Sequence, residues 1–233
     1  MGKIIVIDGT SNAGKTTLCE NIEKNFQNIT IVPGASLFAK IHNEKYPQIP
    51  SIPKSIEEEK ENQKIFFELE LDRLIEANKI AKLGKYVFMD RGVLEILSVA
   101  YSFEDIKRWN GIYENAKKLY ERFILITRER KIELPCKYIW LQADSGEIVR
   151  RNKIRQIERG QKLLENDWIE ENLINKQIEF FNKLCIPENK DKMYLIDTNY
   201  MTKQQVLKNV CDLFNFKSKE RWIRRWLIYI HIR

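Results

Sequence analysis

Short apolar runs alternate with long segments of helical periodicity along most of the chain. The apolar runs show no strict alternation of apolar and polar positions, as is typical of parallel strands covered by helices on both faces. They are Lys3–Ile7, Ile29–Val32, Tyr86–Met89, Tyr138–Leu141 and Met193–Ile196. Helices are expected near Lys15–Phe26, Ile56–Leu83, Leu94–Ser102, Gly111–Thr127, Gly146–Arg159, Trp168–Leu184 and Lys203–Phe214. The pattern predicts an α/β fold.

The composition narrows the class of protein further. Of 233 residues, 43% are hydrophobic and 31% charged, which suits a globular chain with a sizeable core. No apolar run approaches the roughly 18 residues of a membrane span, and the N-terminal one is too short for a signal peptide. A cytoplasmic location is therefore expected. The four cysteines form no CxxC pair, and two histidines argue against a histidine-built metal site.

The net charge of +7 is concentrated in the C-terminal segment. Residues 217–233 hold six basic residues against the single acid Glu220, a balance of +5 that leaves only about +2 elsewhere. We therefore predict one domain over residues 1–215 and a basic, aromatic tail over residues 216–233, and we expect no nucleic-acid partner. Packing of the tail or self-association, such as a homodimer, is favoured over contact with an anionic membrane surface.

The strongest motif is a Walker A phosphate-binding loop between the first strand and the first helix. It comprises Gly9, Thr10, Ser11, Asn12, Ala13, Gly14, Lys15 and Thr16, with Thr17 following. Two glycines allow backbone N–H groups to converge on phosphate oxygens, and the helix directs its positive end at them. Lys15 is expected at the β- and γ-phosphates and Thr16 at Mg²⁺. The loop predicts binding of a nucleoside triphosphate, and MgATP is the one expected.

An acid and an arginine follow the third strand. In a P-loop fold, the strand beside the loop presents an acid near Mg²⁺, and Asp90 suits that role. Arg91 lies one step further out, where it could hold an acceptor. Alone, the pair would be equally well explained by a helix-capping aspartate and a solvated arginine. Together with the Walker A loop, we interpret Asp90 as a magnesium ligand and Arg91 as catalytic.

Three arginines share one face of the helix expected after the fourth strand. Arg151, Arg155 and Arg159 are four residues apart, so their like charges repel unless an anion lies opposite them. A lid near residues 150–166 that closes these arginines over a transferring phosphoryl group would supply such an anion. The alternative is a solvated basic face, partly neutralised by Glu147 and Glu158.

These motifs resemble those of thymidylate kinases and deoxyribonucleoside kinases. The likeness runs over most of residues 1–214 and is dense at the Walker A loop, the Asp90-Arg91 strand end, the arginine helix and the late strand around Ile196. It implies a P-loop three-layer sandwich with a helical lid and a five-stranded parallel sheet of order 2-3-1-4-5. It also implies MgATP as donor and a nucleoside or nucleoside monophosphate as acceptor.

The resemblance also suggests where the acceptor binds. The helix containing Gln63, Phe66 and Arg73 is similar to the one lining the base pocket in those families, and Tyr101 follows on their acceptor-side helix. A glutamine amide can pair with a base edge and an aromatic ring can stack on it. Aromatic residues such as Phe66 and Tyr101 are, however, more often plain core residues than pocket residues.

One position departs from the families. They place a carboxylate just before the proline at the end of the second strand, and Val32 stands there in this chain. Either Asp8 or Asp90 then serves in its place, or the acceptor is different. Asp8 directly precedes the loop, where it could equally cap the turn.

Three functions are compatible with this sequence. The first is a kinase for a nucleoside, a nucleotide or another small hydroxyl compound, and the arginine helix favours it. The second, a regulatory GTPase, lacks the guanine-specifying Asn-Lys-x-Asp, because Asn189-Lys190-Asp191 has no spacer. The third is a nucleotide-dependent binding module without turnover that uses the basic tail.

Overall fold

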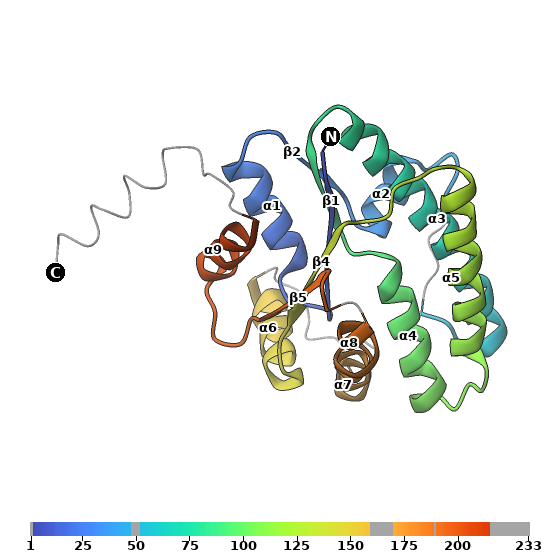
Figure 1. Cartoon of the computed structure of the whole chain (residues 1–233). Helices are drawn as coiled ribbons and strands as arrows, with labels where there is room; N and C mark the ends of the chain where they lie inside the picture. The colour runs from blue at the N-terminus through green and yellow to red at the C-terminus, as the bar shows by residue number, and fades with distance from the viewer. Residues whose placement is uncertain (1, 48–51, 159–169, 189, 215–233) are drawn as a thin grey trace.

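Five parallel strands form one sheet in the order β2-β3-β1-β4-β5. The computed structural model describes residues 2–47, 52–158, 170–188 and 190–214 (Figure 1). The strands are β1 (Ile4–Gly9), β2 (Ile29–Val32), β3 (Tyr86–Asp90), β4 (Lys137–Gln142) and β5 (Met193–Asp197). All five predicted strands are present, and the predicted strand order is confirmed.

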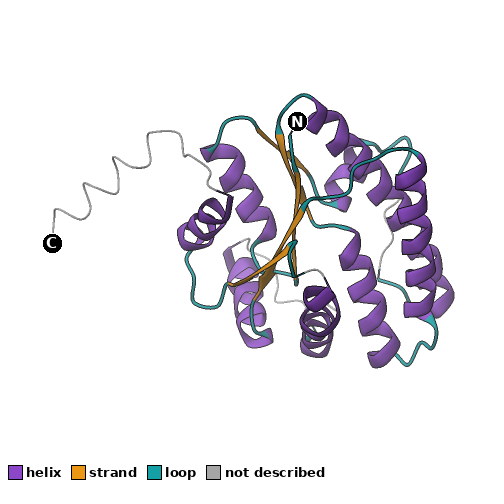
Figure 2. Ribbon diagram, in the orientation of Figure 1, coloured by secondary structure: helices purple, strands orange, loops and turns teal. Residues whose placement is uncertain are grey.

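Helices connect the strands and cover both faces of the sheet (Figure 2). They are α1 (Lys15–Asn25), α2 (Ala35–Ile41), α3 (Ile56–Lys82), α4 (Val93–Ile106), α5 (Ile112–Glu129), α6 (Ser145–Glu158), α7 (Glu171–Phe180), the π-helical turn η2 (Phe181–Cys185), α8 (Ile186–Glu188) and α9 (Lys203–Phe214). Sequence periodicity missed α2, because its seven residues are too few to establish a repeat.

The central strand β1 is covered on both faces, so the fold has three layers, with helices on each side of the sheet. Ile5 and Ile7 belong to the core on one face, which they form together with residues of α1 and α9. Ile4 and Val6 point to the other face, where α3, α4, α5 and η2 provide the partners. Because both faces are buried, the strand is a continuous apolar run, as its sequence indicated.

Some sequence-based expectations lie outside the described residues. The tail, residues 216–233, and the C-terminal part of the expected lid, including Arg159, are in this group. Among the described residues, no helix is both long and apolar enough to cross a membrane.

Candidate functional site

The Walker A segment forms a tight connection from β1 into α1. Gly9 has a φ of 149°, and a Cβ there would lie 2.4 Å from the Leu141 carbonyl oxygen. Gly14 has a φ of 102° and caps α1, whose first residue is Lys15. Glycine is therefore required at Gly9 for space and conformation and at Gly14 for conformation.

Lys15 is folded back onto the loop that precedes it. Its Nζ donates hydrogen bonds of 2.7 Å to the carbonyl oxygens of Gly9 and Thr10. The residue is only 4% exposed. Burial, assisted by the nearby charge of Arg91, lowers the pKa of Lys15 to about 7. Both of these hydrogen bonds go to uncharged carbonyl oxygens, and an arriving polyphosphate would stabilise the charged form of the lysine.

Thr16 and Asp90 form a hydrogen bond at the carboxyl-terminal ends of the central strands. The parallel register places Ile7 beside Asp90, so the end of β3 lies next to the start of the loop. Thr16 Oγ1 donates a 2.8 Å hydrogen bond to Asp90 Oδ2. The other carboxylate oxygen, Asp90 Oδ1, is buried and has no hydrogen-bond partner in the described part of the chain. A buried acceptor without a donor is costly, so this arrangement suits an added ligand.

Asp8 lies immediately beneath the loop and is 1% exposed. Its Oδ1 accepts a 2.9 Å hydrogen bond from the Gly9 N–H, which is the turn-capping role considered from the sequence. Its Oδ2 and the neighbouring Thr10 Oγ1 have no partner among the described residues. Burial raises the pKa of Asp8 to about 6, against the opposing effect of Lys15.

Arg91 leaves the end of β3 in a left-handed conformation, with a φ of 73°. Its N–H donates to the Ile7 carbonyl oxygen at 2.8 Å, so the backbone at this point is fixed to β1. The guanidinium forms an ion pair with Glu95 on the first turn of α4, and the arginine side chain is 36% exposed. Arg91 is therefore held at the edge of the site by a partner that the sequence analysis did not identify.

The Arg73 side chain contacts a carboxylate on its own helix and backbone carbonyl oxygens at the ends of two strands. It is fully buried and forms an ion pair with Glu70, one turn earlier on α3. Its Nε donates to the Pro33 carbonyl oxygen at 2.9 Å, and its Nη2 donates to the carbonyl oxygens of Asp90 at 2.7 Å and Arg91 at 3.2 Å. Arg73 thus joins the ends of β2 and β3.

The other acceptor-pocket candidates are also engaged within the protein. Gln63 is 1% exposed, donates to Glu59 and accepts a 2.8 Å hydrogen bond from Asn115 on α5. The Tyr101 hydroxyl donates to Glu179 at 3.2 Å, and its ring packs against Phe180. Phe66 is half-buried. Contact of these side chains with an acceptor stays a prediction.

The Glu59 carboxylate beside Gln63 gives a prediction on stability. Burial raises its pKa from 4.5 to about 7, so folding penalises the ionised form. Below about pH 4.5, Glu59 is protonated in both the folded and the unfolded state and does not lower the free energy of unfolding. As pH rises through 7, ionisation of Glu59 lowers the free energy of unfolding by about 3 kcal/mol. Glu59→Gln should therefore become progressively more stable than wild type between pH 5 and 8, as measured by urea unfolding. Exposed Glu57→Gln on the same helix is the control, and a parallel response of the two variants would contradict the prediction.

Two of the three predicted arginines, Arg151 and Arg155, lie in the described part of α6, and they contact different parts of the protein. Arg151 bonds to Glu147 and, through Nη1 and Nη2, to the hydroxyl and carbonyl oxygens of Thr198 after β5. Arg155 instead extends toward the Walker A loop, where its Nη1 donates to Asn12 Oδ1 at 3.0 Å. One arginine therefore fixes α6 to the end of β5, and the other reaches the phosphate-binding loop.

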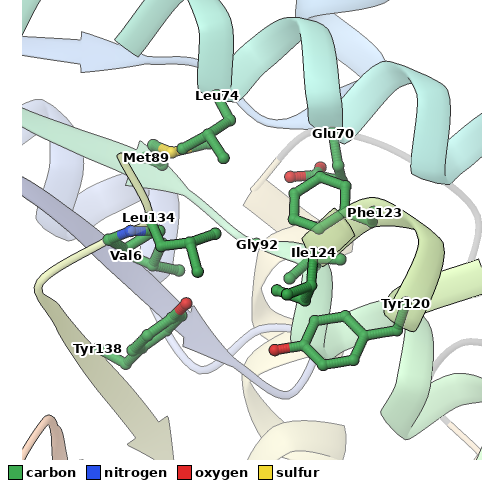
Figure 3. A pocket seen from close by; sticks show the side chains of 12 residues that line it. Val6, Glu70, Leu74, Met89, Gly92, Tyr120, Phe123, Ile124, Leu134 and Tyr138 are labelled. Carbon is green, nitrogen blue, oxygen red and sulfur yellow. The ribbon is translucent and has the colours of Figure 1, made fainter. Parts of the chain in front are cut away.

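A small cavity lies on the face of the sheet beneath α3 and α5 (Figure 3). Apolar side chains such as Leu74 and Phe123 line most of it, and Glu70, Tyr120 and Tyr138 add polar groups. The volume open to the centre of a water molecule is ≈ 20 Å³, enough for about one water molecule. This volume does not accommodate a nucleoside.

Comparisons with known proteins agree on the fold. No protein-family model and no curated protein matches the sequence. Among solved structures, a thymidylate kinase from Candida albicans aligns with a TM-score of 0.63 and 16% identity, covering 92% of this chain and 91% of its own. A deoxyadenosine kinase from M. mycoides with bound dCTP aligns with a TM-score of 0.52 and 20% identity, covering 91% and 98%. This chain therefore has the fold of P-loop nucleoside and nucleotide kinases.

Proposed function

We propose that this protein is an ATP-dependent phosphotransferase that moves the γ-phosphate of MgATP to a nucleoside or nucleoside monophosphate. The observation that carries the proposal is the Thr16–Asp90 hydrogen bond of 2.8 Å beside the buried Lys15. It brings together the groups that a P-loop kinase needs for the metal and the phosphates. The fold shared with a thymidylate kinase and a deoxyadenosine kinase supports the choice of acceptor class.

The residues fit magnesium. Mg²⁺ prefers oxygen ligands and is commonly held by one or two protein oxygens together with substrate phosphates and waters. The Thr16 hydroxyl and the Asp90 carboxylate supply such oxygens, and Asp90 Oδ1 is buried without a partner in the described residues. Within that same part of the chain, there is no cluster of three acidic, histidine or cysteine side chains that would hold a metal alone. When bound, Mg²⁺ would neutralise charge on the phosphates.

The protein's own contribution is positioning and charge neutralisation. Lys15 exchanges its contacts with the Gly9 and Thr10 carbonyl oxygens for phosphate oxygens, and the N-terminus of α1 faces the same anion. Arg91 and Arg155 add positive charge from the acceptor side and the lid side, respectively. Given Val32 at the end of β2, either Asp8, whose pKa burial raises to about 6, or Asp90 would accept the proton of the acceptor hydroxyl.

A coupled assay of ADP formation tests the proposal across nucleosides, nucleoside monophosphates and other small hydroxyl compounds. We expect at least one nucleoside or nucleotide to stimulate ADP release in the presence of Mg²⁺. Stimulation only by other hydroxyl compounds would assign a different acceptor, and ATP binding without stimulated release would refute the kinase. As a site control, Asp90→Asn should lower turnover by about 10²–10³-fold and raise the Mg²⁺ concentration needed for half-maximal rate.

A further inference from the structure

Helix α6 is attached to the Walker A loop through one side chain. Asn12 occupies a loop position that the motif leaves open, and its φ of 56° turns the residue into a left-handed conformation. From there, the amide contacts two residues of α6, a segment about 140 positions later in the chain. Such a long-range contact is not needed for the loop to bind phosphate through its backbone.

The two contacts use both ends of the Asn12 amide. Its Nδ2 donates to Asn152 Oδ1 at 3.3 Å, and its Oδ1 accepts from Arg155 Nη1 at 3.0 Å. Residues 152 and 155 are three apart, so they lie on the same face of α6. A single amide is thereby matched to a donor and an acceptor presented together by that face.

We infer that Asn12 is a positioning residue that holds Arg155 against the phosphate-binding loop before nucleotide arrives. The Asn152 contact fixes the helix, and the Arg155 contact holds a cation by a hydrogen bond to the Asn12 side chain of the loop. A neutral amide is a weaker partner for guanidinium than an anionic phosphate oxygen. Arg155 therefore leaves Asn12 for the phosphate when ATP binds, whereas the Asn152 contact keeps α6 in place.

This inference rests on the proposed function for the role of Arg155 in turnover, but the attachment itself can be tested without catalysis. Hydrogen–deuterium exchange of α6 in the nucleotide-free protein reports how firmly the helix is held. Asn12→Gly is the appropriate variant, because glycine accepts the left-handed backbone and alanine would add strain. We expect the amides of residues 152–158 to exchange at least about fivefold faster, because both hydrogen bonds of the Asn12 amide are lost.

A double-mutant cycle separates this attachment from a general loosening of the loop. Asn12→Gly and Arg155→Ala should show non-additive effects on exchange, because each removes the same contact. Exposed Lys153→Ala on the same helix is the control and should leave exchange unchanged. Unchanged exchange in Asn12→Gly, or fully additive effects of the two substitutions, would overturn the inference whether or not the protein is a kinase.

Turnover gives the second readout once an acceptor is known. A positioning role predicts that Asn12→Gly lowers kcat by about tenfold while the KM for ATP changes by less than about twofold. The expected cause is that Arg155 is no longer held ready, although the loop backbone still binds the phosphates. If Asn12→Gly instead raised the KM for ATP by about tenfold and left kcat unchanged, Asn12 would contribute only to ATP binding, and the inference would be overturned.

Discussion

Replacing Lys15 by alanine is expected to reduce turnover by at least about 10²–10³-fold, the usual loss on removing one preorganised donor to transition-state charge. The lysine is 4% exposed, and its Nζ already lies at the loop carbonyls of Gly9 and Thr10. Its ammonium group therefore already lies within the loop that would hold the phosphates. The measurement is steady-state ADP formation with the best acceptor, together with ATP affinity by calorimetry.

Lys24→Ala is the matched control for this experiment. Lys24 is exposed in the last turn of α1, so the substitution removes the same charge from the same helix at a distance from the loop. It should leave kcat within about twofold of wild type. If Lys15→Ala retained full turnover, the assignment of the loop to ATP phosphates would fail. Equal losses in both variants would indicate an effect of net charge.

The loop and the sheet could be predicted because their signals are local. Gly9 and Gly14 are required by backbone conformation, and the apolar run of β1 precedes them directly. The strand order came from the family resemblance, and the structure confirms it. Predicting the loop and the sheet did not require knowing which face of each helix packs against the sheet. Asp90 likewise followed from its place at the end of a strand beside the loop.

The roles of helix side chains could not be predicted in the same way. Periodicity indicates that α3 has a buried face, but not which element that face meets. Gln63 contacts α5, and Arg73 contacts the ends of two strands. The pairing of Glu70 with Arg73 at i,i+3 was available from the sequence as a signal and was missed. The contact from Asn12 to α6 has no local signal at all.

The second large effect concerns Arg73 and combines stability with activity. Arg73→Met should destabilise the fold by about 3–5 kcal/mol, because it leaves the Glu70 carboxylate buried without its cation. The double variant Glu70→Leu/Arg73→Met should recover most of that loss, since it removes both charges of the buried pair and leaves neither without its partner. Chemical unfolding of wild type, both single variants and the double variant measures the coupling.

Activity of the double variant then distinguishes two roles for Arg73. Its donors to the carbonyl oxygens of Pro33, Asp90 and Arg91 are absent even when stability is restored. If Arg73 acts by fixing the end of β3, turnover should stay low and more Mg²⁺ should be required, because Asp90 is no longer held toward Thr16. If it contacts the acceptor instead, the acceptor KM should rise while the Mg²⁺ requirement is unchanged. Wild-type kinetics in the double variant would show that Arg73 serves only as the ion-pair partner of Glu70 and has no role in turnover. We expect the first outcome, since three of the hydrogen bonds of this fully buried side chain go to strand-end carbonyls.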